Sequence, residues 1–166
     1  MIWEDDARLP ADFDTRLPAL LARLEAGAGD WDVFSGLITD LSPQGEVKAV
    51  HADGANLLIE LDTVIGMVFG VYGRKALNAL AGYRLEGEDV MRDTIDRYLE
   101  TLELRCWTVF PPLVGHADHV SSTLWVPTGS RFLSNEWLNP MIDGSQFRLL
   151  EKIADRLEGA SRPPSP

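Results

Sequence analysis

The stretch MIWEDD, residues 1–6, places an apolar start directly before three consecutive carboxylates, Glu4, Asp5 and Asp6. This pattern predicts a short buried strand whose carboxyl end presents the acids at the rim of a sheet. Open α/β sheets bind their ligands at that rim. Adjacent carboxylates repel one another, so they are stable either in open water or around a cation that neutralises them. The stretch alone leaves both interpretations open, a solvated acidic cluster and a cation site.

The size and charge of the chain restrict the classes of protein to which it can belong. Its 166 residues, 45% hydrophobic and 25% charged, are typical of one globular domain with a real core. The net charge of −11 disfavours binding to nucleic acid or to an anionic membrane surface, because both would repel the chain. An anionic ligand such as a sugar nucleotide therefore requires a divalent metal or a local cationic spot. A small acidic inhibitor of a basic partner is an alternative that rests on the charge alone.

Cysteine usage and the two ends of the chain bear on its location. The single Cys106 cannot form an internal disulfide, and its apolar neighbours indicate a small buried residue. No stretch approaches the ~20 apolar residues that span a bilayer, and no basic-then-apolar signal opens the chain. We therefore expect a cytoplasmic protein without a transmembrane segment. We expect one domain over residues 1–158 and a disordered, proline-rich tail over 159–166.

The sequence contains both helical and strand-like patterns. The apolar spacing of amphipathic helices occurs in residues 13–24, 74–80, 88–102 and 144–157. The last of these carries an apolar stripe that we expect to face the core, formed by Phe147, Leu150, Ile153 and Leu157. Strands are predicted for residues 31–38, 47–52, 55–61, 65–72 and 104–110. Residues 113–139 are expected to form loops. The fold class predicted is α/β, a mixed sheet flanked by helices.

Glycines and prolines mark the turns between these elements. Asp53-Gly54 is a common short hairpin signal, and Pro111-Pro112 ends the last strand because proline supplies no donor to a sheet. Gly66 and Gly70 lie inside a predicted strand, where glycine usually means that another group approaches the backbone closely. That group is either a ligand or a neighbouring part of the chain, and we favour the neighbour.

Two further groups of residues have the chemistry of a site. His116 and His119 lie three apart in the sequence HADH at 116–119, a spacing that suits metal ligands but is often incidental without a third histidine or cysteine. Asp93 and Asp96 lie one turn apart on a predicted helix, where a carboxylate can accept a proton from an attacking hydroxyl. Neighbouring arginines fit a solvated helix face equally well. The chain has no glycine-rich phosphate loop and no Gly-x-Ser-x-Gly elbow, so kinases, dehydrogenases and serine hydrolases lack their signatures here.

Several motifs follow one another in a characteristic order. They are IWEDD at 2–6, a leucine-rich helix at 13–24, WDVFSG at 31–36, GMVFGVY at 66–72 with RKAL at 74–77, DTIDRYL at 93–99, and PPLVGH at 111–116 with Ser121-Ser122. In this order the motifs resemble the middle and end of glycosyltransferase family 25, the enzymes of the lipooligosaccharide-biosynthesis type. The resemblance covers the chain from Glu4 to about Ser122.

The resemblance implies a GT-A type α/β fold and transfer of a sugar from a nucleotide sugar to a glycan hydroxyl, with inversion at the anomeric carbon. It implies Mn²⁺ or Mg²⁺ at the acidic motif, with Glu4 and Asp6 as the contacts to metal and diphosphate. Asp5 would support the ribose or a metal-bound water, and His116 would be a further metal or diphosphate contact. Asp96 would be the acceptor-side acid or general base.

The chain departs from the family pattern at its start. In the family a nucleotide-binding half of the sheet precedes the Glu-Asp-Asp strand, and here only residues 1–3 precede it. We therefore expect the C-terminal portion of a glycosyltransferase-like protein: a partial GT-A-like sheet that lacks its N-terminal half and has little activity alone. An exposed sheet edge would favour association, for instance as a homodimer. The alternative is a non-catalytic carbohydrate-binding or regulatory partner protein that keeps a remnant of the fold.

Overall fold

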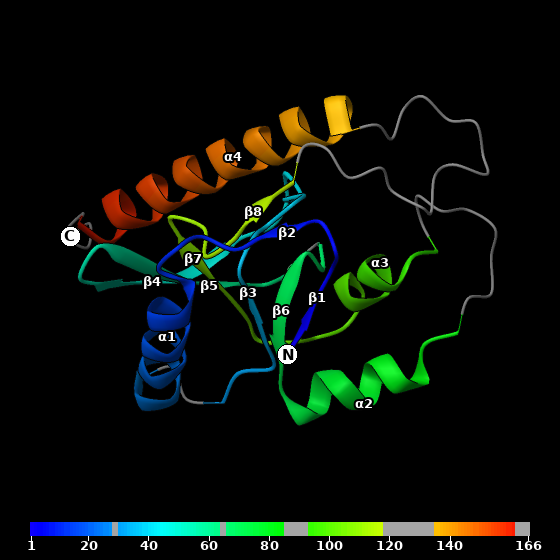
Figure 1. Ribbon diagram of the computed structural model, residues 1–166. Coiled ribbons are helices and arrows are strands. Elements are labelled where there is room, and N and C mark those ends of the chain that lie inside the picture. The colour runs from blue at the N-terminus through cyan, green and yellow to red at the C-terminus, as the bar shows by residue number, and fades with distance from the viewer. Residues whose placement is uncertain (28–29, 64–65, 85–92, 118–134, 162–166) are drawn as a thin grey trace.

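The computed structural model describes residues 1–27, 30–63, 66–84, 93–117 and 135–161 of the chain, except for the side chains of residues 135–138, 160 and 161. These residues form an α/β fold in which helices flank a six-stranded mixed sheet (Figure 1). The predicted fold class is thus confirmed at this level. Among the described helices, none combines the length and the apolar character that crossing a membrane requires.

The main sheet brings together strands that are far apart in the sequence. In spatial order its strands are β1 (Ile2–Trp3), β6 (Phe69–Tyr72), β3 (Val33–Ser35), β7 (Cys106–Phe110), β5 (Asn56–Leu61) and β4 (Val47–Asp53). The β3–β7 pair is parallel, and the other neighbouring pairs are antiparallel. A separate two-stranded ribbon pairs β2 (Ala7–Arg8) with β8 (Gly115–His116). This ribbon fixes the loop after β1 against the loop after β7.

Most of the strand predictions are confirmed, with shorter bounds. The β4–β5 hairpin turns at Gly54, whose φ of +61° suits glycine. Strand β6 does not extend the hairpin but lies between β1 and β3. The groups closest to the two glycines of the strand predicted over residues 65–72 are side chains of this chain, Thr39 at Gly66 and Tyr72 at Gly70. The interpretation that a neighbour approaches these glycines is therefore supported.

The first strand forms as predicted, but it is not buried. Because β1 is the outermost of the described strands and pairs with β6 alone among them, no other described strand lies beside its outer edge. Ile2 is 38% exposed and Trp3 is 53% exposed. The prediction of a buried strand is wrong for this reason, whereas the placement of the acids directly after a strand is correct.

The helices are α1 (Phe13–Gly27), α2 (Arg74–Gly82), α3 (Ile95–Glu100) and α4 (Asn135–Ser161). The apolar face predicted for α1 is largely buried, with Phe13, Leu17, Leu20 and Leu24 in the core. The helix predicted over 88–102 is described only from Ile95, so Asp93 precedes the helix instead of lying on it; residues 85–92 lie outside the described residues. Residues 135–139, expected as loop, are helical. Helix α4 reaches Ser161, and residues 162–166 of the predicted tail lie outside the description.

Helix α4 buries a different face from the one predicted. Among its described side chains, the buried apolar ones are Ile142, Leu149 and Ile153. Of the predicted stripe only Ile153 is buried, while Phe147, Leu150 and Leu157 are 62%, 38% and 48% exposed. The error arises because two apolar stripes run along this helix, and sequence spacing does not say which of them meets the sheet.

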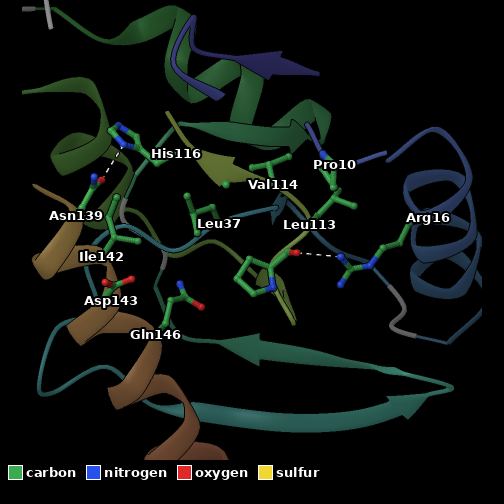
Figure 2. Close-up of a pocket in the computed structure, with 12 residues that line it drawn as sticks. Pro10, Arg16, Leu37, Leu113, Val114, His116, Asn139, Ile142, Asp143 and Gln146 are labelled. Carbon is green, nitrogen blue, oxygen red and sulfur yellow. Dashed lines mark hydrogen bonds between the residues drawn. The ribbon is translucent and has the colours of Figure 1, made fainter. Parts of the chain in front are cut away.

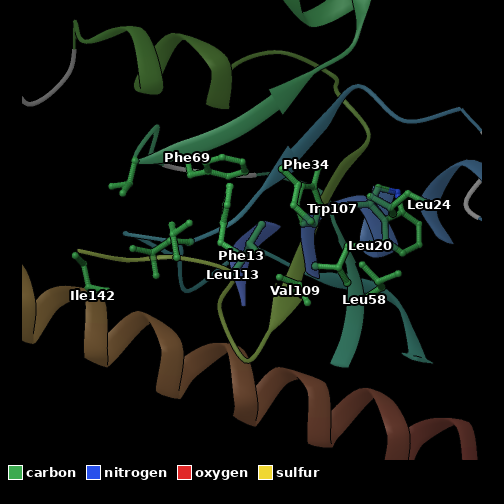
Figure 3. Close-up of a cluster of buried hydrophobic side chains, with 14 residues drawn as sticks. Phe13, Leu20, Leu24, Phe34, Leu58, Phe69, Trp107, Val109, Leu113 and Ile142 are labelled. Atoms are coloured by element: carbon green, nitrogen blue, oxygen red, sulfur yellow. The ribbon is translucent and has the colours of Figure 1, made fainter. Parts of the chain in front are cut away.

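Two hydrophobic clusters hold the layers together, one on each face of the sheet. In the first, shown in Figure 3, α1 packs on strand residues such as Phe34, Trp107 and Val109. In the second, α2, α3 and most of α4 pack on the opposite face, around Ile59 and Cys106. Adjacent residues of β7 thus contribute to opposite clusters, as the alternation of side chains along a strand requires.

Candidate functional site

The carboxylate of Glu4, just after β1, is influenced by charges from the start of the chain and from α3. The backbone N–H of Glu4 donates to the carbonyl of Val68 at 3.0 Å, which fixes Glu4 beside β6. The pKa of Glu4 is raised from 4.5 to about 7, first by partial loss of solvent and then by the negative charges of Asp6 and Asp96. Both aspartates therefore lie close enough to Glu4 to repel its charged form. The structure brings together residues that are some ninety positions apart in the sequence.

The β2–β8 ribbon brings Asp6 and His116 together. Ala7 pairs with His116 in the ribbon, and the N–H of Ala117 donates to the backbone carbonyl of Asp6 at 2.8 Å. As a result, the Nε2 atom of His116 lies 3.1 Å from Oδ2 of Asp6. This short ribbon is the element that carries His116 into the acidic cluster, where it opposes the rise in the pKa of Glu4.

His116 also connects the acidic cluster to α4. Its side chain is only 4% exposed, and its Nδ1 atom lies 3.1 Å from Oδ1 of Asn139. The second carboxylate oxygen of Asp6, Oδ1, is buried and has no hydrogen-bond partner among the described residues. A buried carboxylate oxygen without a donor is costly, so this atom is available to a cation, a water or a ligand hydrogen.

Tyr72 is a member of this cluster that the sequence analysis missed. It is buried at the end of β6, and burial raises the pKa of its hydroxyl, with further contributions from the charges of Glu4 and Asp96. A Cβ atom at Gly70 would lie 2.5 Å from the Tyr72 hydroxyl, so the missing side chain at Gly70 makes room for the ring. The signal available in the sequence was the Gly-Val-Tyr alternation, which places both residues on one face of the strand.

Short helix α3 is anchored by polar contacts as well as by buried Leu99. Arg97 donates to Asp40 at 2.9 Å and to Glu100 at 3.1 Å. Tyr83 donates to the carbonyl of Asp93 at 2.5 Å, just before the helix begins. These contacts fix the direction of a helix that is only six residues long, and hence the position of Asp96 in its first turn.

An open pocket of about 620 Å³ lies on the other side of His116. Figure 2 shows its wall, which combines α4 with the segment after β7 and with Arg16 of α1. Its apolar residues include Leu37, Leu113 and Ile142, and its polar residues are Arg16, His116, Asn139, Asp143 and Gln146. The volume is in the range of small-molecule sites. His116 and Asn139 thus form the boundary between this pocket and the acidic cluster.

The predicted site residues are placed as follows. Four of them interact with one another: the pKa of Glu4 responds to the charges of Asp6, Asp96 and His116. Asp5 is exposed, and its charge has the weakest effect on the pKa of Glu4. His119 and Asp118 lie outside the described residues. Within the described part of the chain, no three histidine, cysteine, aspartate or glutamate side chains are arranged to hold a metal ion. Cys106 is buried as predicted, and burial raises the pKa of its thiol to about 12, which argues against a reactive thiol.

Comparisons of the chain with models of protein families, with curated proteins and with solved structures found no match. Function is therefore inferred from the residues of the site. Two features distinguish this site from an ordinary polar surface. They are the raised pKa of Glu4 and the buried, unpaired oxygen of Asp6.

Proposed function

We propose that this protein is a glycosyltransferase with a GT-A-like sheet, which transfers a sugar from a nucleotide sugar to a glycan hydroxyl. One observation carries the proposal: His116 lies 3.1 Å from Asp6, and the charges of Asp6, Asp96 and His116 all act on the carboxylate of Glu4. Three carboxylates that repel one another beside a pocket are suited to a cation and to proton transfer. The resemblance to glycosyltransferase family 25 gives these same residues their roles.

Glu4 and Asp6 are the proposed ligands of Mn²⁺ or Mg²⁺. Such cations often use only one or two carboxylates and complete their coordination with waters and substrate phosphates. Two protein ligands therefore suffice, and the unpaired Oδ1 of Asp6 is a suitable oxygen. The cation would supply charge stabilisation to the departing nucleoside diphosphate. His116 and Asp5 are proposed to contact the diphosphate and the ribose.

Asp96 is the proposed general base. The acceptor hydroxyl oxygen forms a bond to the anomeric carbon, the bond from that carbon to the diphosphate oxygen breaks, and the hydroxyl proton passes to Asp96. Helix α3 holds this carboxylate near Glu4 through the contacts of Arg97. Glu4 and Asp6, the proposed cation ligands, are not required to accept the proton.

The test is turnover of a panel of nucleoside diphosphate sugars, with and without Mn²⁺. We expect weak hydrolysis or transfer that needs Mn²⁺ and falls ~100-fold or more in the variants Asp6→Asn and Asp96→Asn. Glu151→Gln is the matched control, because Glu151 is exposed on α4 away from the cluster. The proposal is wrong if the protein neither turns over nor binds any of these donors in the presence of Mn²⁺, or if the two variants behave like the control.

The second candidate is a non-catalytic carbohydrate-binding or regulatory partner protein. The pocket of about 620 Å³, which combines apolar and hydrogen-bonding residues, favours it, because such a wall can bind a sugar without a cation. The double variant Glu4→Ala/Asp6→Ala separates the two candidates. Loss of Mn²⁺-dependent nucleotide binding with the fold retained supports the enzyme, whereas sugar binding that ignores both substitutions and Mn²⁺ supports the binding protein.

We further propose that copies of the chain associate through the edge strand β1. Its outer side is not paired with any described strand, and it carries the exposed side chains of Ile2 and Trp3. Edge strands with apolar side chains are ready templates for pairing with another chain.

A further inference from the structure

The 620 Å³ pocket beside His116 has an electrostatic character different from that of the acidic cluster. The one cationic side chain among its described lining residues, Arg16, is already engaged. Its guanidinium donates to Asn56 Oδ1 at 2.9 Å, to the carbonyl of Pro112 at 2.9 Å and to the carbonyl of Pro111. Arg16 therefore joins α1 to the segment after β7 and is not presented to a ligand. A phosphate would find no free cation on this part of the wall, and the carboxylate of Asp143 would repel it.

The wall offers hydrogen-bond acceptors instead. Asn139, Asp143 and Gln146 are spaced four and three residues apart on α4, so they lie on the same face of the helix. The Gln146 amide is held by donation from Nε2 to the carbonyl of Ile38 at 2.7 Å, and its Oε1 atom is buried without a partner among the described residues. For the exposed Asp143 carboxylate, the described residues likewise supply no hydrogen bond or ion pair.

The rest of the wall is apolar. Leu37, Leu113 and Ile142 are core residues among those that line the pocket, and Leu37 and Ile142 keep 4% and 6% of their surface exposed. A ligand that fits this combination has a C–H surface to cover the apolar residues and several neutral donors to reach Asp143 and Gln146. A sugar ring has both, since its hydroxyls donate and its ring carbons form an apolar patch.

From this combination we propose that the pocket binds a neutral sugar and that this sugar is the acceptor. The role as acceptor rests on the proposed function, whereas binding can be tested independently. Asp143 and Gln146 accept from hydroxyls of the sugar. His116 and Asn139 lie at the boundary with the acidic cluster, so a hydroxyl of the bound sugar next to this pair is the one directed towards the reacting centre.

The binding test is an NMR titration of the full chain with galactose, glucose, lactose, glucosamine and inorganic phosphate. We expect at least one of the three neutral sugars to bind in the millimolar range and to shift amides of α4 near Asp143. Asp143→Ala should weaken that binding ~10-fold, and Gln146→Met should weaken it with an unchanged fold. The matched control is Asp155→Asn, because Asp155 is exposed on the same helix and does not line the pocket.

Three results would overturn the inference: none of the neutral sugars binds, phosphate or glucosamine binds more tightly than they do, or neither pocket variant weakens binding. Failure of the proposed function gives a different pattern. If sugar binding depends on Asp143 but no donor sugar is turned over, the pocket is a sugar site and the transferase proposal is wrong. If transfer occurs and Asp143→Ala leaves the acceptor KM unchanged, the transferase proposal stands and this inference is wrong.

Discussion

The charge of Glu4 depends on the fold. Its pKa is raised from 4.5 to about 7 by partial loss of solvent around the carboxylate and by the negative charges of Asp6 and Asp96. Between pH 4.5 and pH 7 the carboxyl group of Glu4 keeps its proton in the folded protein and loses it in the unfolded chain. The contribution to stability is therefore complete below about pH 4.5 and is lost as the pH rises through 7.

Replacing Glu4 by Gln removes this dependence. We expect Glu4→Gln to match the wild type in urea unfolding at pH 4.5 and to exceed it by at most ~1 kcal/mol at pH 8, because solvent screens a partly exposed carboxylate. Glu25→Gln, on the exposed side of α1, is the control. It should change the free energy of unfolding by the same amount at pH 4.5 and at pH 8. An equal effect of Glu4→Gln at both pH values would mean that Glu4 titrates normally.

Gly70 sets the position of the Tyr72 ring beside the cluster. A Cβ atom at Gly70 would lie 2.5 Å from the Tyr72 hydroxyl, so Gly70→Ala must displace the ring and should cost ~1–3 kcal/mol in the free energy of unfolding. Gly82 at the end of α2 is the matched control, because nothing lies within 4 Å of a Cβ atom there. Gly82→Ala should be neutral or stabilising, by up to ~1 kcal/mol. Equal losses in the two variants, measured by urea unfolding, would contradict the steric reason.

Among the elements, α4 shows what helical periodicity can predict and what it cannot. Spacing predicts an amphipathic helix correctly but cannot choose between its two apolar stripes, because only the sheet decides which side is buried. We expect Leu149→Ala, at a fully buried position, to cost ~2–5 kcal/mol. Phe147→Ala, at a position 62% exposed, should change the free energy of unfolding by no more than ~0.5 kcal/mol. Urea unfolding of both variants tests the assignment, and a larger loss at Phe147 would reverse it.

Because α3 is only six residues long, contacts with the rest of the protein set its orientation. We therefore expect Arg97 to act as a positioning residue for Asp96. Arg97→Met removes the contacts to Asp40 and Glu100 and should lower kcat ~10-fold with little change in KM. With Asp96 displaced, the pKa of Glu4 should fall, which shifts the acid limb of the pH profile to lower pH. Lys48→Met is the control. It removes the exposed ion pair between Lys48 of β4 and Glu46, and it should leave the pH profile of activity unchanged. An unshifted profile in Arg97→Met would leave Arg97 with a structural role only.

At the scale of the whole molecule, the sequence predicts which segments are strands but not their order. The Asp53-Gly54 hairpin follows from local turn chemistry, whereas β6 lies between β1 and β3, and β3 runs parallel to β7, through contacts that no local pattern encodes. The candidate site shows the same division. The acids after β1 stand out in the sequence, but Tyr72 joins them only because β6 and β1 are neighbours.

The sheet order also has a consequence for assembly, because it leaves β1 at the edge with Trp3 53% exposed. If this edge pairs two copies, sedimentation velocity should show a dimer that forms as concentration rises, and Trp3→Lys should abolish it, since lysine on an edge strand opposes pairing. The exposed apolar face of α4 is the competing surface, so Phe147→Lys is the matched variant and should leave the dimer intact. A protein that stays monomeric at all concentrations, or a dimer lost only with Phe147→Lys, would show that the β1 edge is not an interface. Because Glu4 follows Trp3 directly, a dimer through this edge would also place the acidic cluster next to the partner chain, and Trp3→Lys should then alter nucleotide binding as well as assembly.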